Sequence, residues 1–131
     1  MRIHESAEDY LETILMISKR KQFVRSIDIV NELNYSKPSV SIAMKRLREE
    51  GKIVMDPDGY ITLTETGRDI AERIYERHIL ISKLLMRLGV EEKTALEEAC
   101  RIEHDISQDT FDRIKAWFHE DSGDAHQSVQ Q

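Results

Sequence analysis

A hairpin pattern directly after two short helices constrains this fold more than any other feature of the chain. Apolar residues recur at helical spacing in residues 27–33 and again in residues 37–50. Two short apolar segments, 53–55 and 60–63, then flank a turn of sequence Asp-Pro-Asp-Gly. Helix, turn, helix and hairpin in this order predict a winged helix-turn-helix.

The remaining segments are predicted to be helical, which makes the fold class mainly α with a small β-hairpin. Apolar positions at helical spacing indicate a first helix before residue 20 and three further helices, over 65–88, 91–105 and 107–119. Residues 121–131 lack an apolar pattern and are expected to be disordered. The expected division is therefore a winged helix-turn-helix in 1–64, a long linker helix with a second helical domain in 65–120, and a tail in 121–131.

Charge is distributed unevenly along the chain, whose net charge is −6. Residues 19–52 carry nine Lys or Arg against four acids, whereas residues 64–131 carry nine basic and fifteen acidic residues. A locally basic segment attracts phosphates even in an acidic chain. The first half is therefore suited to nucleic acid and the second half to cations.

The second helix of the helix-turn-helix has the composition of a DNA recognition helix. Such a helix carries short polar side chains in its N-terminal turns and basic ones beside them. The residues that supply these side chains, on the face away from the apolar stripe, are Ser36, Lys37, Ser39, Ser41 and Lys45. Arg25 precedes the first helix of the motif and is a candidate backbone contact. A plain amphipathic helix with a solvated basic face is the competing interpretation.

A second cluster lies near the other end of the chain. Cys100, Glu103 and His104 stand at i, i+3 and i+4, so a helix presents all three on one face. A thiolate, a carboxylate and an imidazole together suit a divalent transition ion. The competing interpretation of Cys100, the single cysteine of the chain, is a small buried apolar residue.

Three further residues carry metal-ligand chemistry but have strong alternative explanations. Asp9 and Glu12 lie one turn apart, and paired acids near a helix N-terminus also offset the helix dipole. His78 stands beside apolar residues, where a packed core histidine is the common case. Spacing alone does not place these residues near Cys100.

The chain resembles the diphtheria-toxin-repressor family, which includes iron-dependent repressors and manganese regulators. The resemblance covers residues 5–120. It is carried by the segments Glu8-Asp9-Tyr10-Leu11-Glu12, Ser36–Leu47, Leu63-Thr64-Glu65-Thr66-Gly67, Arg77-His78 and Glu97-Glu98-Ala99-Cys100-Arg101-Ile102-Glu103-His104. The last of these segments is the most specific.

This resemblance implies a metal-activated homodimeric repressor of metal-homeostasis genes. The helices after Glu91 would form the dimerisation domain, and a two-fold dimer would bind an inverted-repeat operator. By matching positions, the resemblance implies a ligand set of Asp9, Glu12, His78, Cys100, Glu103 and His104. No enzymatic activity and no small-molecule substrate follow from it.

Two positions combine features of the iron and manganese branches. Iron-type members have a methionine at the position of Asp9, and manganese-type members have a glutamate at the position of Cys100. A thiolate favours softer ions than a carboxylate does. We therefore expect Fe(II) to be favoured, with Mn(II) second.

Two other functions are compatible with the residues. A winged-helix regulator that does not sense metal would use the acids as surface charge, and a metalloenzyme would need an open coordination position. No nucleophile–base pair or phosphate loop supports the enzyme. A single cysteine and the absence of any long apolar run predict a cytoplasmic protein with no membrane partner.

Overall fold

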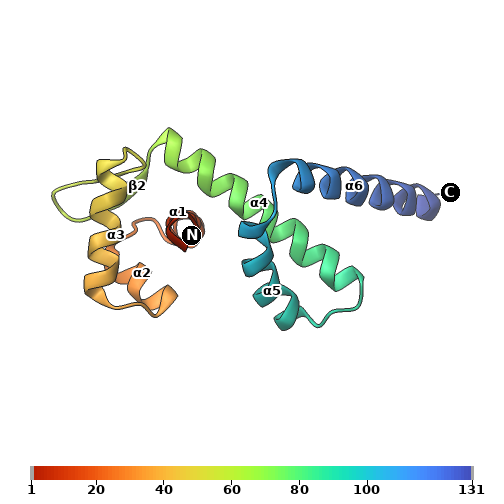
Figure 1. Cartoon of the computed structure of the whole chain (residues 1–131), viewed down its shortest axis with the longest axis horizontal. Helices are drawn as coiled ribbons and strands as arrows, with labels where there is room; N and C mark the ends of the chain where they lie inside the picture. Colours follow the sequence, from red (N-terminus) through yellow and green to blue (C-terminus); the bar gives the residue numbers. More distant parts are fainter. Residues whose placement is uncertain (1, 131) are drawn as a thin grey trace. The chain divides into compact units, whose positions relative to one another are not determined.

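The computed structural model describes the backbone of residues 2–130 and the side chains of residues 7–120 (Figure 1). Within this range the chain forms six helices and one hairpin, and the fold class predicted from the sequence is confirmed. The elements in chain order are α1 (Arg2–Arg20), α2 (Ser26–Leu33), α3 (Lys37–Glu49), β1 (Ile53–Met55), β2 (Ile61–Leu63), α4 (Glu65–Arg87), α5 (Glu92–Asp105) and α6 (Gln108–Gln130).

The chain divides into two compact units, Met1–Tyr75 and Glu76–Gln131. The division falls inside α4, whereas the sequence suggested a boundary at residue 64. The first unit contains the helix-turn-helix, the hairpin and the first half of α4. The second unit contains the rest of α4 with α5 and α6.

The core of the first unit is built from the apolar stripes that the sequence predicts, with one correction in α2. The stripe of α1 is buried, and Leu11 is fully covered. In α2, Ile29 is buried at 0% exposure, while Ile27, which the apolar spacing of residues 27–33 predicts to face inward together with Val30 and Leu33, is 43% exposed. The prediction for Ile27 was wrong because residues two apart lie on opposite faces of a helix, and the face that meets the core passes through Ile29.

The hairpin is held by a turn and by a third segment of chain. Strands β1 and β2 pair antiparallel, with Ile53 opposite Leu63. The Asp56 carboxylate accepts hydrogen bonds from the backbone N–H groups of Asp58 and Tyr60, both at 2.9 Å. The N–H of Ile61 also donates to the carbonyl of Val24 at 2.8 Å, which ties the hairpin to the connection between α1 and α2.

The start of α4 packs closely against the residue that precedes β1. Thr64 caps α4 by accepting a hydrogen bond from the Gly67 N–H at 3.1 Å. A Cβ atom on Gly67 would lie 2.0 Å from the carbonyl oxygen of Lys52. Only glycine permits this approach, so the Thr64–Gly67 segment fixes where α4 leaves the hairpin.

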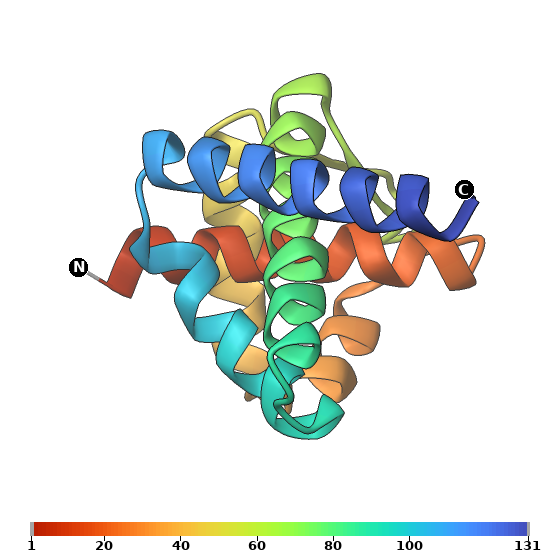
Figure 2. The same cartoon turned by 90° about the vertical axis from the view of Figure 1, so that its right-hand side faces the viewer.

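In the second unit, α5 and α6 both lie against the second half of α4 (Figures 1 and 2). Leu80 of α4 packs with Phe111 and Phe118 of α6, and Phe111 is fully buried. Ala95 and Ala99 are the buried apolar residues of α5.

The last helix continues further than the sequence suggested. A helix end near residue 119 and a disordered tail from 121 were expected, but α6 extends to Gln130. The tail sequence contains no proline, and its one glycine, Gly123, only weakens a helix without breaking it. Among the described residues, no helix combines the length and apolar character that a membrane span requires.

Candidate metal centre and DNA-binding surface

The structure brings His78, Cys100 and Glu103 together within the second unit. The Nδ1 atom of His78 lies 3.0 Å from a carboxylate oxygen of Glu103 and 3.7 Å from the Sγ atom of Cys100. One candidate ligand atom from each residue lies within 4.8 Å of the other two. His78 comes from α4, and the other two residues come from successive turns of α5.

The carboxylate of Glu103 is buried between two histidine side chains. Glu103 is 0% exposed and His78 is 9% exposed, whereas Cys100 remains accessible to solvent. A buried carboxylate is costly unless cationic or hydrogen-bonding partners surround it. The Nε2 atom of His104 lies 3.4 Å from the second oxygen of Glu103, so two imidazoles flank one buried carboxylate.

The donor set fits a divalent transition ion. In a tetrahedral site with bonds of about 2.1 Å to nitrogen and 2.3 Å to sulfur, the two ligand atoms are separated by roughly 3.6 Å. The 3.7 Å between His78 Nδ1 and Cys100 Sγ is close to this separation, whereas the 3.0 Å between His78 Nδ1 and Glu103 is a hydrogen-bond distance that a bound cation would have to widen. A cation would also neutralise the buried Glu103 carboxylate.

Arg77 fixes the end of α5 that carries this cluster. Its guanidinium donates to the carbonyl oxygens of Glu103 at 3.0 Å and Ile106 at 2.9 Å, and to the side chain of Gln108 at 3.0 Å. Carbonyls at a helix C-terminus lack partners within the helix, and a buried cation satisfies them. Because Arg77 precedes His78 in α4, the same turn that carries the imidazole also holds the end of α5.

Asp9 and Glu12, the other two predicted ligands, lie on α1 in the first unit. Asp9 is half-buried and Glu12 is buried at 6% exposure. Burial raises the pKa of the neighbouring Tyr10 hydroxyl, and the charges of Tyr35 and Asp9 act in the same direction. Their spacing of one turn and their partial burial suit a second pair of carboxylate ligands.

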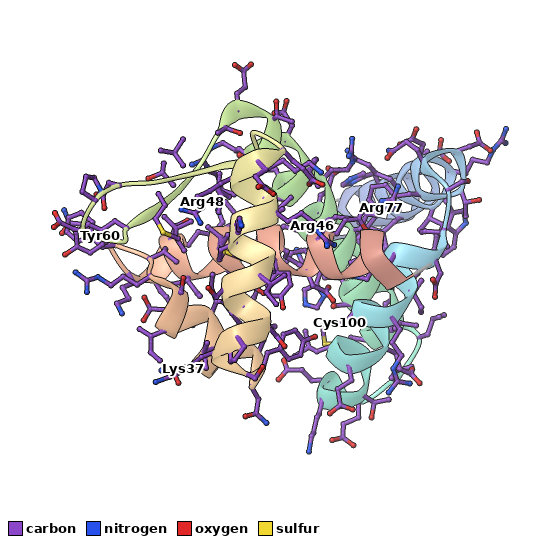
Figure 3. The ribbon with its side chains drawn as sticks, turned by 60° about the vertical axis from the view of Figure 1, so that its left-hand side comes forward. Lys37, Arg46, Arg48, Tyr60, Arg77 and Cys100 are labelled. Carbon is purple, nitrogen blue, oxygen red and sulfur yellow. The ribbon has the colours of Figure 1, made fainter. Side chains whose placement is uncertain are left out.

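The predicted DNA-binding residues of α3 are all exposed, and they differ in what their side chains do (Figure 3). Ser36 caps α3: its hydroxyl accepts from the Ser39 N–H at 3.2 Å and donates to the Ser39 hydroxyl at 2.8 Å. Lys37 and Lys45 extend from the exposed face. The role of Ser36 in capping leaves the lysines and Ser41 with the more accessible polar groups.

Arg25 lies beside the hairpin rather than on α3. Its guanidinium lies 4.5 Å from the centre of the Tyr60 ring, and Phe23 stacks on the same ring at a centroid distance of 4.5 Å. The backbone N–H of Arg25 donates to the Asp28 carboxylate at 2.9 Å. Stacking holds the Arg25 side chain at the hairpin, where Figure 3 shows Tyr60.

Four residues that bear on the site were not among the predicted site residues. Arg77 was noted only as part of a motif, and its contacts to α5 depend on tertiary structure. Arg46 and Arg48 add positive charge near the C-terminal end of α3 (Figure 3). Ile42 lies on the exposed side of α3, and the sequence signal was its position outside the stripe formed by the buried residues of that helix.

The winged helix-turn-helix followed by a helical unit with a metal-ligand cluster defines a class of metal-dependent transcription regulators. Residues 2–61 match the N-terminal DNA-binding domain of iron-dependent repressors, and residues 64–129 match the metal-binding and dimerisation domain. The chain belongs to this family, which includes the manganese regulators of the MntR type.

Named relatives agree with this assignment. An uncharacterised HTH-type transcriptional regulator of Methanocaldococcus jannaschii is 37% identical over 113 residues, which cover 85% of this chain and 90% of the relative. The HTH-type transcriptional regulator MntR of Lysinibacillus sphaericus is 31% identical over 109 residues, covering 83% of this chain and 78% of the relative. Both relatives are transcription regulators.

Solved structures show the same fold. The manganese regulator SloR superposes with a TM-score of 0.77 at 30% identity, covering 86% of this chain and 53% of SloR. IdeR of T. acidophilum superposes with a TM-score of 0.76 at 28% identity, covering 86% of this chain and 53% of IdeR. The chain therefore spans about half the length of these solved proteins.

Proposed function

We propose that this chain is a metal-activated transcriptional repressor that binds operator DNA as a homodimer. The observation that carries the proposal is that His78 Nδ1 faces both the Cys100 thiol and the buried Glu103 carboxylate. This cluster lies in the part of the chain that matches a metal-binding and dimerisation domain. The matched DNA-binding domain precedes it in the same chain.

The proposed ligand set is the one implied by the family resemblance. His78, Cys100 and Glu103 form the part for which the structure supplies distances. His104 follows Glu103 in the same turn of α5, and the resemblance adds Asp9 and Glu12 of α1 to the proposed set. A bound cation would supply positive charge that neutralises the carboxylates among its ligands.

Fe(II) is the favoured ion in this proposal, with Mn(II) second. Cys100 supplies a thiolate, which suits iron better than it suits manganese. Carboxylates keep manganese viable, and the similar protein SloR is a manganese regulator. The Cys100 thiolate therefore favours Fe(II), whereas the similarity to SloR favours Mn(II).

In this function, α3 lies in the major groove of DNA, and the basic residues around α3 contact the phosphates. Lys37, Lys45 and Arg25 are the candidate phosphate contacts, with the serines Ser36, Ser39 and Ser41 at the helix N-terminus. A dimer that carries two such helices reads half-sites about 34 Å apart, which implies an inverted-repeat operator. Operators upstream of metal-homeostasis genes are the expected targets.

No catalytic role is proposed, because the relatives are regulators of transcription. We expect the repressor in the cytoplasm, because its proposed partner is DNA and a single cysteine cannot form a disulfide within the chain. The alternative function is a winged-helix regulator that does not bind metal. Its DNA binding would be the same with metal and with chelator.

The test combines metal binding and DNA binding in anaerobic buffer. Co(II), Fe(II) and Mn(II) are titrated by calorimetry, and Co(II) is also followed by its thiolate charge-transfer absorption. DNA fragments enriched by the protein from a random duplex pool are then titrated by fluorescence anisotropy, with each ion or with chelator.

We expect a Co(II)–thiolate band that Cys100→Ala abolishes and DNA binding that requires metal. Loss of a residue that hydrogen-bonds to a metal ligand typically weakens metal binding by about 10–100-fold. Glu103 is itself a proposed ligand, so Glu103→Gln should weaken metal binding by at least roughly that factor. Equal DNA binding with chelator and with metal would favour the alternative regulator. Asp9→Asn and Glu12→Gln test the α1 ligands, with Glu8→Gln as the control on the same helix.

A further inference from the structure

Ile42 is a large apolar side chain that the fold leaves exposed on α3. Its exposure is 63%, whereas the other large apolar residues of this helix are buried: Val40 is 0%, Met44 is 1% and Leu47 is 2% exposed. Single exposed apolar residues are common on protein surfaces, so exposure alone assigns no role. The role of Ile42 follows from its position on this particular helix.

Ile42 occupies the middle of the helix face that the proposed function directs at DNA. Residues one turn away on either side, Ser39, Lys45 and Arg46, are exposed and polar or basic. Lys37 and Arg48 add positive charge toward the two ends of α3 (Figure 3). An isoleucine rimmed by cations suits a polyanion with an apolar group at its centre better than it suits an apolar protein surface.

The major groove of DNA offers one such apolar group on its base edges. Thymine carries a C5-methyl group there, and uracil and cytosine lack it. The isoleucine side chain has no donor or acceptor, so it gains from a methyl group. It also leaves the polar edge of a cytosine or guanine without a partner when it covers that edge.

We infer that Ile42 is a specificity-determining residue that selects thymine by packing against its methyl group in the major groove. The inference rests on the proposed function, in which α3 enters that groove. Phosphate contacts from lysines position a protein without reading sequence, and serine hydroxyls pair with several bases. Ile42 therefore supplies base selectivity that the polar residues of this face lack.

The experiment selects sequences from a random duplex pool with the full chain, with Mn(II) or anaerobic Fe(II) and with a chelator arm. Wild type, Ile42→Ala and Val54→Ala are compared. Val54 is the matched control, since it is an apolar residue of the same unit with 57% exposure, on β1. Alanine favours helix, so Ile42→Ala is expected to fold, and circular dichroism of the variant tests this.

Selected duplexes are then synthesised with deoxyuridine in place of thymidine, one position at a time. This change removes the C5-methyl group and preserves base pairing. Burial of one methyl-sized group corresponds to about a fourfold change in affinity. We expect wild type and Val54→Ala to lose about fourfold at one thymine of the half-site, and Ile42→Ala to bind both duplexes equally.

Three outcomes overturn the inference in distinguishable ways. If Ile42→Ala selects the same thymine and keeps the same uracil penalty, Ile42 does not read it and the repressor function stands. If wild type shows no uracil penalty at any position, methyl recognition is absent. If wild type selects no sequence with metal, the proposed function fails and the inference fails with it.

Discussion

The guanidinium of Arg77 donates a 3.0 Å hydrogen bond to the main-chain carbonyl of Glu103, whose carboxylate faces His78. One side chain of α4 thus holds the backbone of a candidate metal ligand, and the next residue of α4 is itself a candidate ligand. The geometry of the cluster depends on this contact between helices as well as on the ligands themselves.

Replacement of Arg77 by methionine is expected to destabilise the second unit. The variant keeps much of the apolar stem but leaves the carbonyls of Glu103 and Ile106 without their charged donor. Hydrogen bonds from charged groups contribute about 1.5–3 kcal/mol each, so the free energy of unfolding should fall by about 3 kcal/mol. Urea denaturation followed by circular dichroism measures the change.

Arg113→Met is the matched control for this prediction. Arg113 pairs with Asp109 one turn away on α6, and both side chains are largely exposed. Exposed pairs of this kind contribute about 0.2–1 kcal/mol, so this variant should be close to wild type. Equal losses in the two variants would show that the contacts of Arg77 to α5 contribute nothing beyond ordinary surface charge.

Replacement of Cys100 by glutamate is expected to shift the metal preference toward manganese. The change exchanges a thiolate for a carboxylate, and carboxylate oxygens suit Mn(II). Calorimetric titration should show a higher ratio of Mn(II) to Co(II) affinity than in wild type. Cys100→Ser, which removes the thiolate without adding a carboxylate, is the control, and an unchanged ratio in the glutamate variant would exclude Cys100 from metal selection.

The sequence predicted local structure well because the relevant signals are local. The apolar spacing of α3, the Thr64 cap and the Asp56–Gly59 turn each act within a few residues, and the structure confirms them. Cys100 and Glu103 shared a helix face by spacing alone. Their proximity to His78 required contact between α4 and α5, which no local pattern encodes.

The differences between prediction and structure have physical causes of the same kind. Ile27 and Ile29 are both apolar and lie on opposite faces of α2, and the packing of α2 against its neighbours decides which of them is buried. The role of Arg77 depends on partners in a distant segment, Glu103 and Ile106. The exposure of Ile42 could not be predicted because its apolar character alone indicates burial, and packing of the helices decides which face of α3 meets the core.

Replacement of Gly67 by alanine is expected to destabilise the first unit although alanine is the better helix former. The intrinsic gain is about 1 kcal/mol, but the new Cβ would lie 2.0 Å from the Lys52 carbonyl oxygen. Backbone must then shift, and overpacking of this kind costs about 1–3 kcal/mol or more. Gly67→Ala should therefore unfold at a lower temperature than wild type. Thr66→Ala, at an exposed neighbouring position, is the control, and its unfolding temperature should change less.

Replacement of Ser36 is expected to lower the stability of the fold, whereas replacement of Lys37 is expected to weaken DNA binding directly. Ser36→Ala removes the cap of α3 and should lower the free energy of unfolding by about 1 kcal/mol. Lys37→Ala should leave stability unchanged and reduce the slope of log affinity against log salt by about 1 for each lost phosphate contact. Urea denaturation and anisotropy titrations at several salt concentrations separate the two effects, and an unchanged salt slope for Lys37→Ala would remove Lys37 from the DNA contacts.

Asp28 is expected to make the stability of the first unit depend on pH in the acid range. Burial favours its neutral form, but the Lys21 ammonium, the Arg25 N–H and the charges of both residues together hold the pKa of the carboxyl below its ordinary value of 3.8. A carboxyl with a lowered pKa stabilises the folded state above its unfolded pKa, and this contribution is lost as pH falls through the folded pKa.

Asp28→Asn should therefore be less stable than wild type at pH 7, by about 1 kcal/mol for the loss of a charged helix cap. The difference between the two proteins should shrink as pH is lowered below about 3.8, where wild type loses the same interaction. Urea denaturation at a series of pH values measures this, with the exposed turn variant Asp58→Asn as the control. A difference that stays constant from pH 7 to pH 2 would mean that the Asp28 charge does not stabilise the fold.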